Sequence, residues 1–92
     1  MKTKVPIPTI RPGQYKAFRG AMGANLPGTV DEFSDLTKKK VNETLRRGET
    51  PIEVEVEFHE FIRFCGTRGT KPNDKTLLDF AYEKMAGQQY WA

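Results

Sequence analysis

The stretch from Thr50 to Gly66 constrains the fold more than any other part of the chain, because it holds the densest run of large apolar residues. These residues are Ile52, Val54, Val56, Phe58, Phe61, Ile62, Phe64 and Cys65. A chain of 92 residues is long enough for one hydrophobic core and too short for two. The sequence therefore predicts a single domain, residues 1–92, whose core includes this stretch.

Two secondary structures fit the stretch. From 52 to 58, apolar residues alternate with glutamates, which is typical of a strand that is buried on one face. A helix fits as well, with Thr50 as its cap, Pro51 at its first position and Gly66 at its end. The apolar face of such a helix would comprise Val54, Phe58, Phe61, Ile62 and Cys65.

The lack of a good partner strand favours the helix. A strand at 52–58 needs a neighbour, and the two candidates are Lys4–Ile10 and Gln88–Ala92. The first contains Pro6 and Pro8, which donate no hydrogen bonds, and the second is short. We therefore interpret the stretch as a helix, and we keep a strand at 52–58 in a small antiparallel sheet as the alternative.

The rest of the chain is predicted to form an extended arm followed by helices. Residues 1–10 contain two prolines and form the arm. Helices are predicted over about 13–22, from a capping box at Thr29 to Gly48, and over about 74–86, where Gly87 ends the last one. The predicted fold class is thus mainly α, a small domain of about four short helices with an extended N-terminal arm, and the alternative is α+β.

Spacings of three and four residues define the predicted buried faces of these helices. They comprise Tyr15, Phe18 and Met22 in the first, Val30, Phe33, Thr37, Val41 and Leu45 in the second, and Leu77, Leu78, Ala81, Tyr82 and Met85 in the last. At the C-terminus, Tyr90 and Trp91 either fold back onto the core or contact a partner.

The charge is distributed unevenly along the chain. Residues 1–30 carry +5 and no acid, residues 31–60 carry −4 and residues 61–92 carry +2, which gives +3 overall. A surface of two signs suits a partner that exposes both phosphates and protein, although the same charges also fit a domain that they only keep soluble.

Basic residues are the candidate contacts with such a partner. Three consecutive lysines project from a helix in three directions, which complementarity to the helix dipole explains poorly. The segment from Gly66 to Asn73 is glycine-rich and basic, so it either cradles a phosphate or is only a flexible turn. The candidate set is Lys38, Lys39, Lys40, Arg46, Arg47, Arg68 and Lys71, with Lys16 and Arg19 next.

Residues that support catalysis or metal binding do not gather in the sequence. The single histidine, His59, and the single cysteine, Cys65, point in opposite directions on a helix, so they form no local pair of base and nucleophile. No metal-ligand or phosphate-loop spacing is present. We therefore expect no enzymatic activity, metal, cofactor or small-molecule substrate. No apolar run suits a membrane span or a signal peptide, so the cytoplasm is the expected compartment.

The whole chain, from Met-Lys-Thr-Lys-Val-Pro-Ile-Pro through Glu-Val-Glu-Val-Glu-Phe to Tyr-Trp-Ala, resembles the small phage-encoded anti-CRISPR proteins that act on type I-F surveillance complexes. The resemblance lies in length, mixed charge, near-absence of cysteine and lack of an active site. That group shares no motif and no common fold, so no residue role is carried over from it.

The resemblance implies a non-catalytic inhibitor that acts in the host bacterial cell. Such an inhibitor binds CRISPR-associated protein subunits, with contact to the guide RNA allowed, and it blocks target DNA recognition. The positive net charge argues against mimicry of DNA. The alternative function is a small phage DNA-binding or regulatory protein.

Overall fold

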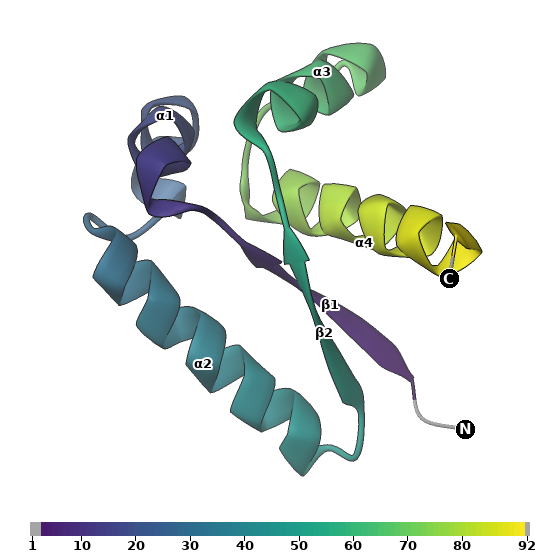
Figure 1. Ribbon diagram of the computed structural model, residues 1–92. Coiled ribbons are helices and arrows are strands. Elements are labelled where there is room, and N and C mark those ends of the chain that lie inside the picture. The colour runs from purple at the N-terminus through teal and green to yellow at the C-terminus, as the bar shows by residue number, and fades with distance from the viewer. Residues whose placement is uncertain (1–2, 92) are drawn as a thin grey trace.

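The chain folds as a two-stranded ribbon held between helices (Figure 1). The structure is a computed structural model that describes residues 3–91, with side chains as far as residue 87. The elements in order are β1 (Lys4–Thr9), α1 (Pro12–Met22), the short 3-10 helix η1 (Gly23–Asn25), α2 (Val30–Arg46), β2 (Thr50–Glu55), α3 (Phe58–Arg68) and α4 (Asp74–Trp91). The mainly helical class is confirmed, and the predicted arm forms a strand.

The apolar stretch in the middle of the chain is divided between a strand and a helix. Its first half is β2, so the helix that we favoured there is wrong and the alternative strand is correct, shifted to residues 50–55. The helix begins only at Phe58, where the carboxylate of Glu57 accepts a hydrogen bond from the amide of Glu60 at 2.8 Å. It continues through Gly66 and ends at Gly69, whose φ of 65° lies in the left-handed region.

Strand β2 pairs with β1, although the two prolines of β1 predict a poor partner strand. The pairing is parallel, and the antiparallel sheet expected in the alternative is wrong. Lys4 lies opposite Thr50 at one end of the ribbon, and Thr9 lies opposite Glu55 at the other. A parallel pair requires a long crossover connection, which α1, η1 and α2 supply.

The prolines of β1 do not weaken this pairing, because they point away from β2. The carbonyls of Thr3 and Thr9 accept hydrogen bonds from the β2 side of the ribbon, each at 2.9 Å. Backbone polar groups alternate between the two edges of a strand, so the odd-numbered residues of β1 face β2. Pro6 and Pro8 therefore lie with their nitrogens on the outer edge, where no ladder bond is lost.

Helices α2 and α4 cover opposite faces of the ribbon (Figure 1). On one face, Val54 of β2 packs against Ala81 and Met85 of α4. On the other face, α2 lies against both strands, while the side chains of Glu53 and Glu55 on β2 remain exposed. The face of β2 toward α4 is therefore apolar, and its opposite face is largely polar.

A larger aromatic core lies at the end of the ribbon where α1 and α3 meet. Phe18 of α1 and Phe61 of α3 are fully buried, and their rings stack with centroids 5.6 Å apart. Phe80 of α4 contacts Phe61 at 5.8 Å between centroids. The side-chain oxygen of Gln14 also accepts a hydrogen bond from the amide of Phe58 at 3.0 Å, which fixes the start of α3 against α1.

The predicted buried faces are correct for α1 and partly wrong for the two long helices. All three apolar residues predicted for α1 are buried. On α2, Thr44 is buried where Leu45 was expected, and Leu45 is 57% exposed. On α4, Phe80 is buried while Leu78 and Tyr82 are exposed. Both helices are rotated relative to the prediction because their apolar stripes are broad enough to allow more than one orientation.

The last helix is longer than predicted. It continues past Gly87 to Trp91, so the predicted end at residue 86 is wrong. A glycine ends a helix only where the chain turns into the left-handed region, and Gly87 does not have a positive φ. The expectation for Tyr90 and Trp91 concerns side chains outside the described residues. None of the helices within residues 3–91 combines the length and the hydropathy that crossing a bilayer requires.

The buried position of Phe61 gives a test of the core. Phe61→Ala removes a ring with no exposed surface, so we expect a loss of about 3–5 kcal/mol in the free energy of unfolding. Ile62→Ala is the control, because Ile62 is 37% exposed and should lose much less. Urea unfolding of both variants measures the difference, and equal losses would mean that the core is placed wrongly.

The cap of α3 predicts an acid-sensitive contribution to stability. The hydrogen bond from the amide of Glu60 holds the pKa of Glu57 below its ordinary value of 4.5. The folded chain then binds this proton more weakly than the unfolded chain, so the contribution is present above pH 4.5 and is lost as the pH falls further. The melting temperature of wild type should therefore exceed that of Glu57→Gln at pH 7, and the gap should narrow at pH 3.

The control for this prediction is Glu53→Gln, which changes an exposed glutamate on β2 outside any helix cap. Its melting temperature should follow the wild-type profile across the same pH range. A gap between wild type and Glu57→Gln that stays constant from pH 7 to pH 3 would contradict the assigned cap.

Candidate functional site: an apolar groove beside a basic helix

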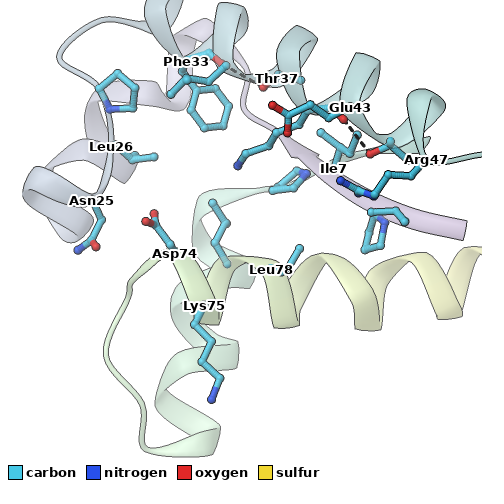
Figure 2. A pocket seen from close by; sticks show the side chains of 18 residues that line it. Ile7, Asn25, Leu26, Phe33, Thr37, Glu43, Arg47, Asp74, Lys75 and Leu78 are labelled. Carbon is cyan, nitrogen blue, oxygen red and sulfur yellow. Dashed lines mark hydrogen bonds between the residues drawn. The ribbon is translucent and has the colours of Figure 1, made fainter. Parts of the chain in front are cut away.

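An open groove of about 520 Å³ runs between α2 and α4 along the outer edge of β1. Figure 2 shows its walls, with α2 on one side, the start of α4 on the other and the loop after η1 at one end. Its apolar lining comprises Val5, Pro6, Ile7, Pro8, Leu26, Pro27, Phe33, Leu36, Leu77 and Leu78. Its polar lining comprises Asn25, Thr37, Lys40, Glu43, Thr44, Arg47, Asp74 and Lys75.

The α2 wall is apolar in effect, because its buried hydroxyls are satisfied within the helix. Thr37 donates to the carbonyl of Phe33 at 3.0 Å, and Thr44 donates to the carbonyl of Lys40 at 2.7 Å. Within the described part of the chain, no buried side-chain nitrogen or oxygen lacks a hydrogen-bond partner. The wall therefore offers a ligand apolar contact rather than unpaired hydroxyl donors.

The outer edge of β1 forms the floor and presents acceptors without donors at its two prolines. Pro6 and Pro8 have no amide hydrogen, and their carbonyls face away from β2 into the groove. An incoming strand needs both donors and acceptors along the edge to form a ladder. The floor therefore resists the addition of a third strand, which is how exposed edges are commonly protected.

The loop at one end of the groove is held by two side chains of α1. The hydroxyl of Tyr15 donates to the carbonyl of Pro27 at 2.6 Å, and Nε of Arg19 donates to the carbonyl of Leu26 at 3.1 Å. Burial raises the pKa of Tyr15, so this donor keeps its proton in neutral solution. Arg19, predicted as a partner contact, thus also positions a wall of the groove.

Two leucines on opposite lips of the groove are left open to solvent. Leu36 of α2 is 45% exposed, and Leu78 of α4 is 40% exposed. Leu78 was predicted to lie in the core, and Leu36 was not among the predicted site residues. A leucine beside the regular stripe of α2 was the one signal for this lip that the sequence contained. Paired exposed leucines over an apolar floor are a feature of interaction surfaces.

The rim of the groove carries charges of both signs. Lys40 and Arg47, both predicted contacts, line it from the α2 side, and Arg47 is ion-paired with Glu49 at 2.7 Å. In Figure 2, Asp74 points into the gap near the η1 end, whereas Lys75 points away from it. The α2 lip therefore carries two basic residues with the acid Glu43 between them, and the start of α4 contributes a second acid.

The other predicted contacts are divided between α2 and distant elements. Lys38, Lys39 and Arg46 are exposed on α2 and do not line the groove. The remaining three, Lys16, Arg68 and Lys71, lie on α1, at the end of α3 and in the loop before α4. The structure thus brings five of the basic residues together along the second half of α2 and its end.

Arg68 belongs to a second, shallower hollow between α3 and α4. Its guanidinium lies 4.4 Å from the ring centroid of Phe64 and forms an ion pair with Glu83. Across the same hollow, Lys84 pairs with Glu60 at 2.8 Å. These charges join two helices, so the hollow has a structural explanation.

The glycine-rich segment from Gly66 to Asn73 does not form the phosphate-binding loop that its composition allows. Its first residues are the last turn of α3. At its other end, the side chain of Asn73 accepts a hydrogen bond from the amide of Thr76 at 2.9 Å, and the Thr76 hydroxyl donates to the carbonyl of Lys71 at 2.6 Å. The segment is a connection between two capped helices.

His59 and Cys65 lie on different sides of the same helix, α3, as their spacing predicted. His59 is exposed, while Cys65 is buried in the aromatic core. Burial raises the pKa of the Cys65 thiol, which disfavours the reactive thiolate. Among residues 3–87, no group of three or more histidine, cysteine, aspartate or glutamate side chains is placed to hold a metal ion.

Comparison with known proteins does not extend this description: no family model, no curated protein and no solved structure matches the chain. The candidate site is therefore defined by its geometry alone. It consists of the groove and the basic half of α2 that forms one of its lips.

The exposed lips predict that an apolar dye binds the native protein at the groove. Leu36→Ser and Leu78→Ser together should lower the fluorescence of a bound naphthalene sulfonate dye, because they remove apolar surface from both lips. Leu45→Ser is the control, since Leu45 is exposed on the same helix but does not line the groove. The free energy of unfolding, measured by thermal denaturation, should change by no more than about 0.5 kcal/mol for each exposed leucine that is replaced. Equal dye loss in the control would contradict this site.

Proposed function

We propose that the protein is a non-catalytic inhibitor that binds a CRISPR guide-RNA–protein surveillance complex of type I-F and blocks target DNA recognition. The observation that carries the proposal is an exposed basic half-helix, residues 38–47, placed directly beside an open apolar groove. The first feature suits phosphate or acidic protein, and the second suits protein. A guide-RNA–protein complex offers both kinds of surface at one place.

Binding rather than catalysis is supported by what the groove contains. Its polar lining offers lysine, arginine and carboxylate groups on the rim and internally bonded threonines on the wall. His59 and Cys65, the side chains most often used as base and nucleophile, lie on α3 outside the groove. The partner class and the type I-F assignment rest on the resemblance described above. A small phage DNA-binding protein remains the alternative, supported by the same basic helix.

Co-elution tests the proposal directly. Purified protein is mixed with a guide-loaded type I-F surveillance complex, and target DNA binding is measured on the same fractions. Co-elution with loss of DNA binding is the expected result. Co-elution with DNA binding intact would move the block to a later step, such as nuclease recruitment, and absence of co-elution would overturn the proposal.

The basic half of α2 should contribute to that binding. Lys38, Lys39 and Lys40 changed together to Glu should weaken co-elution without unfolding the domain, because all three are exposed. A control with the same change in net charge alters Lys4, Arg11 and Arg63 to Glu, none of which lies on α2 or lines the groove. If both triple variants lose binding equally, the effect is one of net charge and the basic half-helix is not the contact.

Salt dependence separates the proposal from the alternative. A protein that binds the backbone of free DNA should lose affinity steeply as salt rises, in proportion to the number of phosphates that it contacts. The proposed inhibitor should bind free DNA weakly at every salt concentration and the assembled complex tightly. Tight, salt-sensitive binding to bare DNA would favour the DNA-binding alternative.

A further inference from the structure

We infer that the groove receives one amphipathic helix from a protein subunit of the partner complex, with its apolar stripe over the floor and an acidic flank along α2. This inference rests on the proposed function, since it names the segment that the inhibitor would bind. The groove's length, its floor, its lips and its charge each bear on the occupant.

The length of the groove fits a helix of about four turns. Its α2 wall extends from Phe33 to Arg47, which is about 21 Å at a rise of 1.5 Å per residue. A compact small molecule would fill only part of that length. The volume of about 520 Å³, distributed over it, is too narrow for a whole helix of about 10 Å diameter. The groove therefore accommodates a row of side chains from one face of a helix.

The floor excludes the other common peptide conformation. An extended peptide binds an open sheet edge by exchanging backbone hydrogen bonds with it. Pro6 and Pro8 withhold their donors from the outer edge of β1, so such a peptide would leave its own carbonyls without partners there. A helix satisfies its backbone internally and requires only side-chain contact from the groove.

The lips match the anchor spacing of a bound helix. Leu36 and Leu78 project from α2 and α4 on either side of the floor and are the exposed leucines of the groove. Apolar anchors at intervals of three and four residues on a partner helix would cover both of them. Binding would thereby remove from water apolar surface that folding of the domain alone leaves exposed.

The charge of α2 predicts which side chains flank the bound segment, and the lining of the groove favours protein over RNA. Residues 38–47 contain five basic residues and one acidic residue. Lys40, Arg47 and the acid Glu43 line the groove, and the other three basic residues are exposed elsewhere on α2, so the helix as a whole favours an acidic flank. Single-stranded RNA would use this lip as well, but it binds through aromatic side chains on which its bases stack. The aromatic side chain that lines the groove, Phe33, is buried at its base with 9% of its surface exposed.

The test uses a synthetic peptide of fifteen residues with leucines at intervals of three and four, glutamates on one flank and alanines elsewhere. Calorimetric titration should detect binding to wild type, and Leu36→Glu or Leu78→Glu should weaken it at least about tenfold, as expected of central apolar anchors. Tyr82→Glu adds the same charge to α4 at a position that is 46% exposed and does not line the groove, so it should stay within about twofold of wild type. A peptide with lysines in place of the glutamates should bind less well than the acidic one.

Several outcomes would overturn the inference. They are absence of peptide binding to wild type, an equal loss in Tyr82→Glu, equal binding of the lysine peptide, or displacement of the acidic peptide by a single-stranded RNA of fifteen nucleotides at equal concentration. Circular dichroism melting of each variant identifies any that has unfolded. Leu36→Glu and Leu78→Glu change opposite lips of the groove, so the test can still be made if one of them does not fold.

The same variants separate this inference from the proposed function. If wild type and Leu36→Glu co-elute equally with the surveillance complex, the groove is not the contact and the proposed function stands. If wild type binds the peptide but no surveillance complex, the groove is a helix-binding site and the proposed function fails. Loss of co-elution in Leu36→Glu but not in Tyr82→Glu would support both.

Discussion

The parallel pairing of β1 with β2 is the constraint on which the rest of the structure depends. It joins the start of the chain to its middle, so the elements between the two strands must form a crossover that returns to the end of the ribbon where β1 began. Because the ribbon has only two strands, neither face is protected by further sheet, and each requires a helix. Helices α2 and α4 supply that cover, and their separation by the ribbon is what creates a groove between them (Figure 1). The site is thus a consequence of a sheet that ends after two strands.

Pro6 and Pro8 determine why the sheet ends there. On the inner edge of β1, the residues that face β2 are those with amide hydrogens, so the pairing is complete. On the outer edge, the prolines remove the donors that a third strand would use. The same two residues bury their rings against the α4 side and therefore also contribute to the core. A replacement that restored the donors would leave an open, partly apolar edge between two helices, which is a site for strand addition and aggregation.

Local signals in the sequence were sufficient for the helices and insufficient for the ribbon. The capping box at Thr29 and the stripe of Tyr15, Phe18 and Met22 act within one or two helical turns, and both appear in the structure as predicted. Strand pairing depends on a partner far along the chain, and the sequence does not reveal which edge a proline will face. Glutamate is also an uncommon helix cap, so nothing marked Glu57 as the boundary between β2 and α3. The basic half of α2 could be predicted because charge is visible in the sequence. The groove could not, because Leu36 and Leu78 have the same residue type as a core leucine.

The exposed leucines of α2 and α4 are informative because of where they lie relative to the buried faces of these helices. Folding buries Phe33 and Thr44 on α2 and Leu77 and Ala81 on α4, and it leaves Leu36 and Leu78 exposed. The described part of the chain does not cover these two leucines, and the prolines of β1 withhold the donors that a further strand would need. Single exposed leucines are common and require no explanation, but Leu36 and Leu78 line one groove over one apolar floor. Basic residues outnumber acids on the second half of α2, which favours a partner with an acidic flank. A surface that is apolar at its centre and basic along one side is suited to a partner that is apolar and acidic at the matching places.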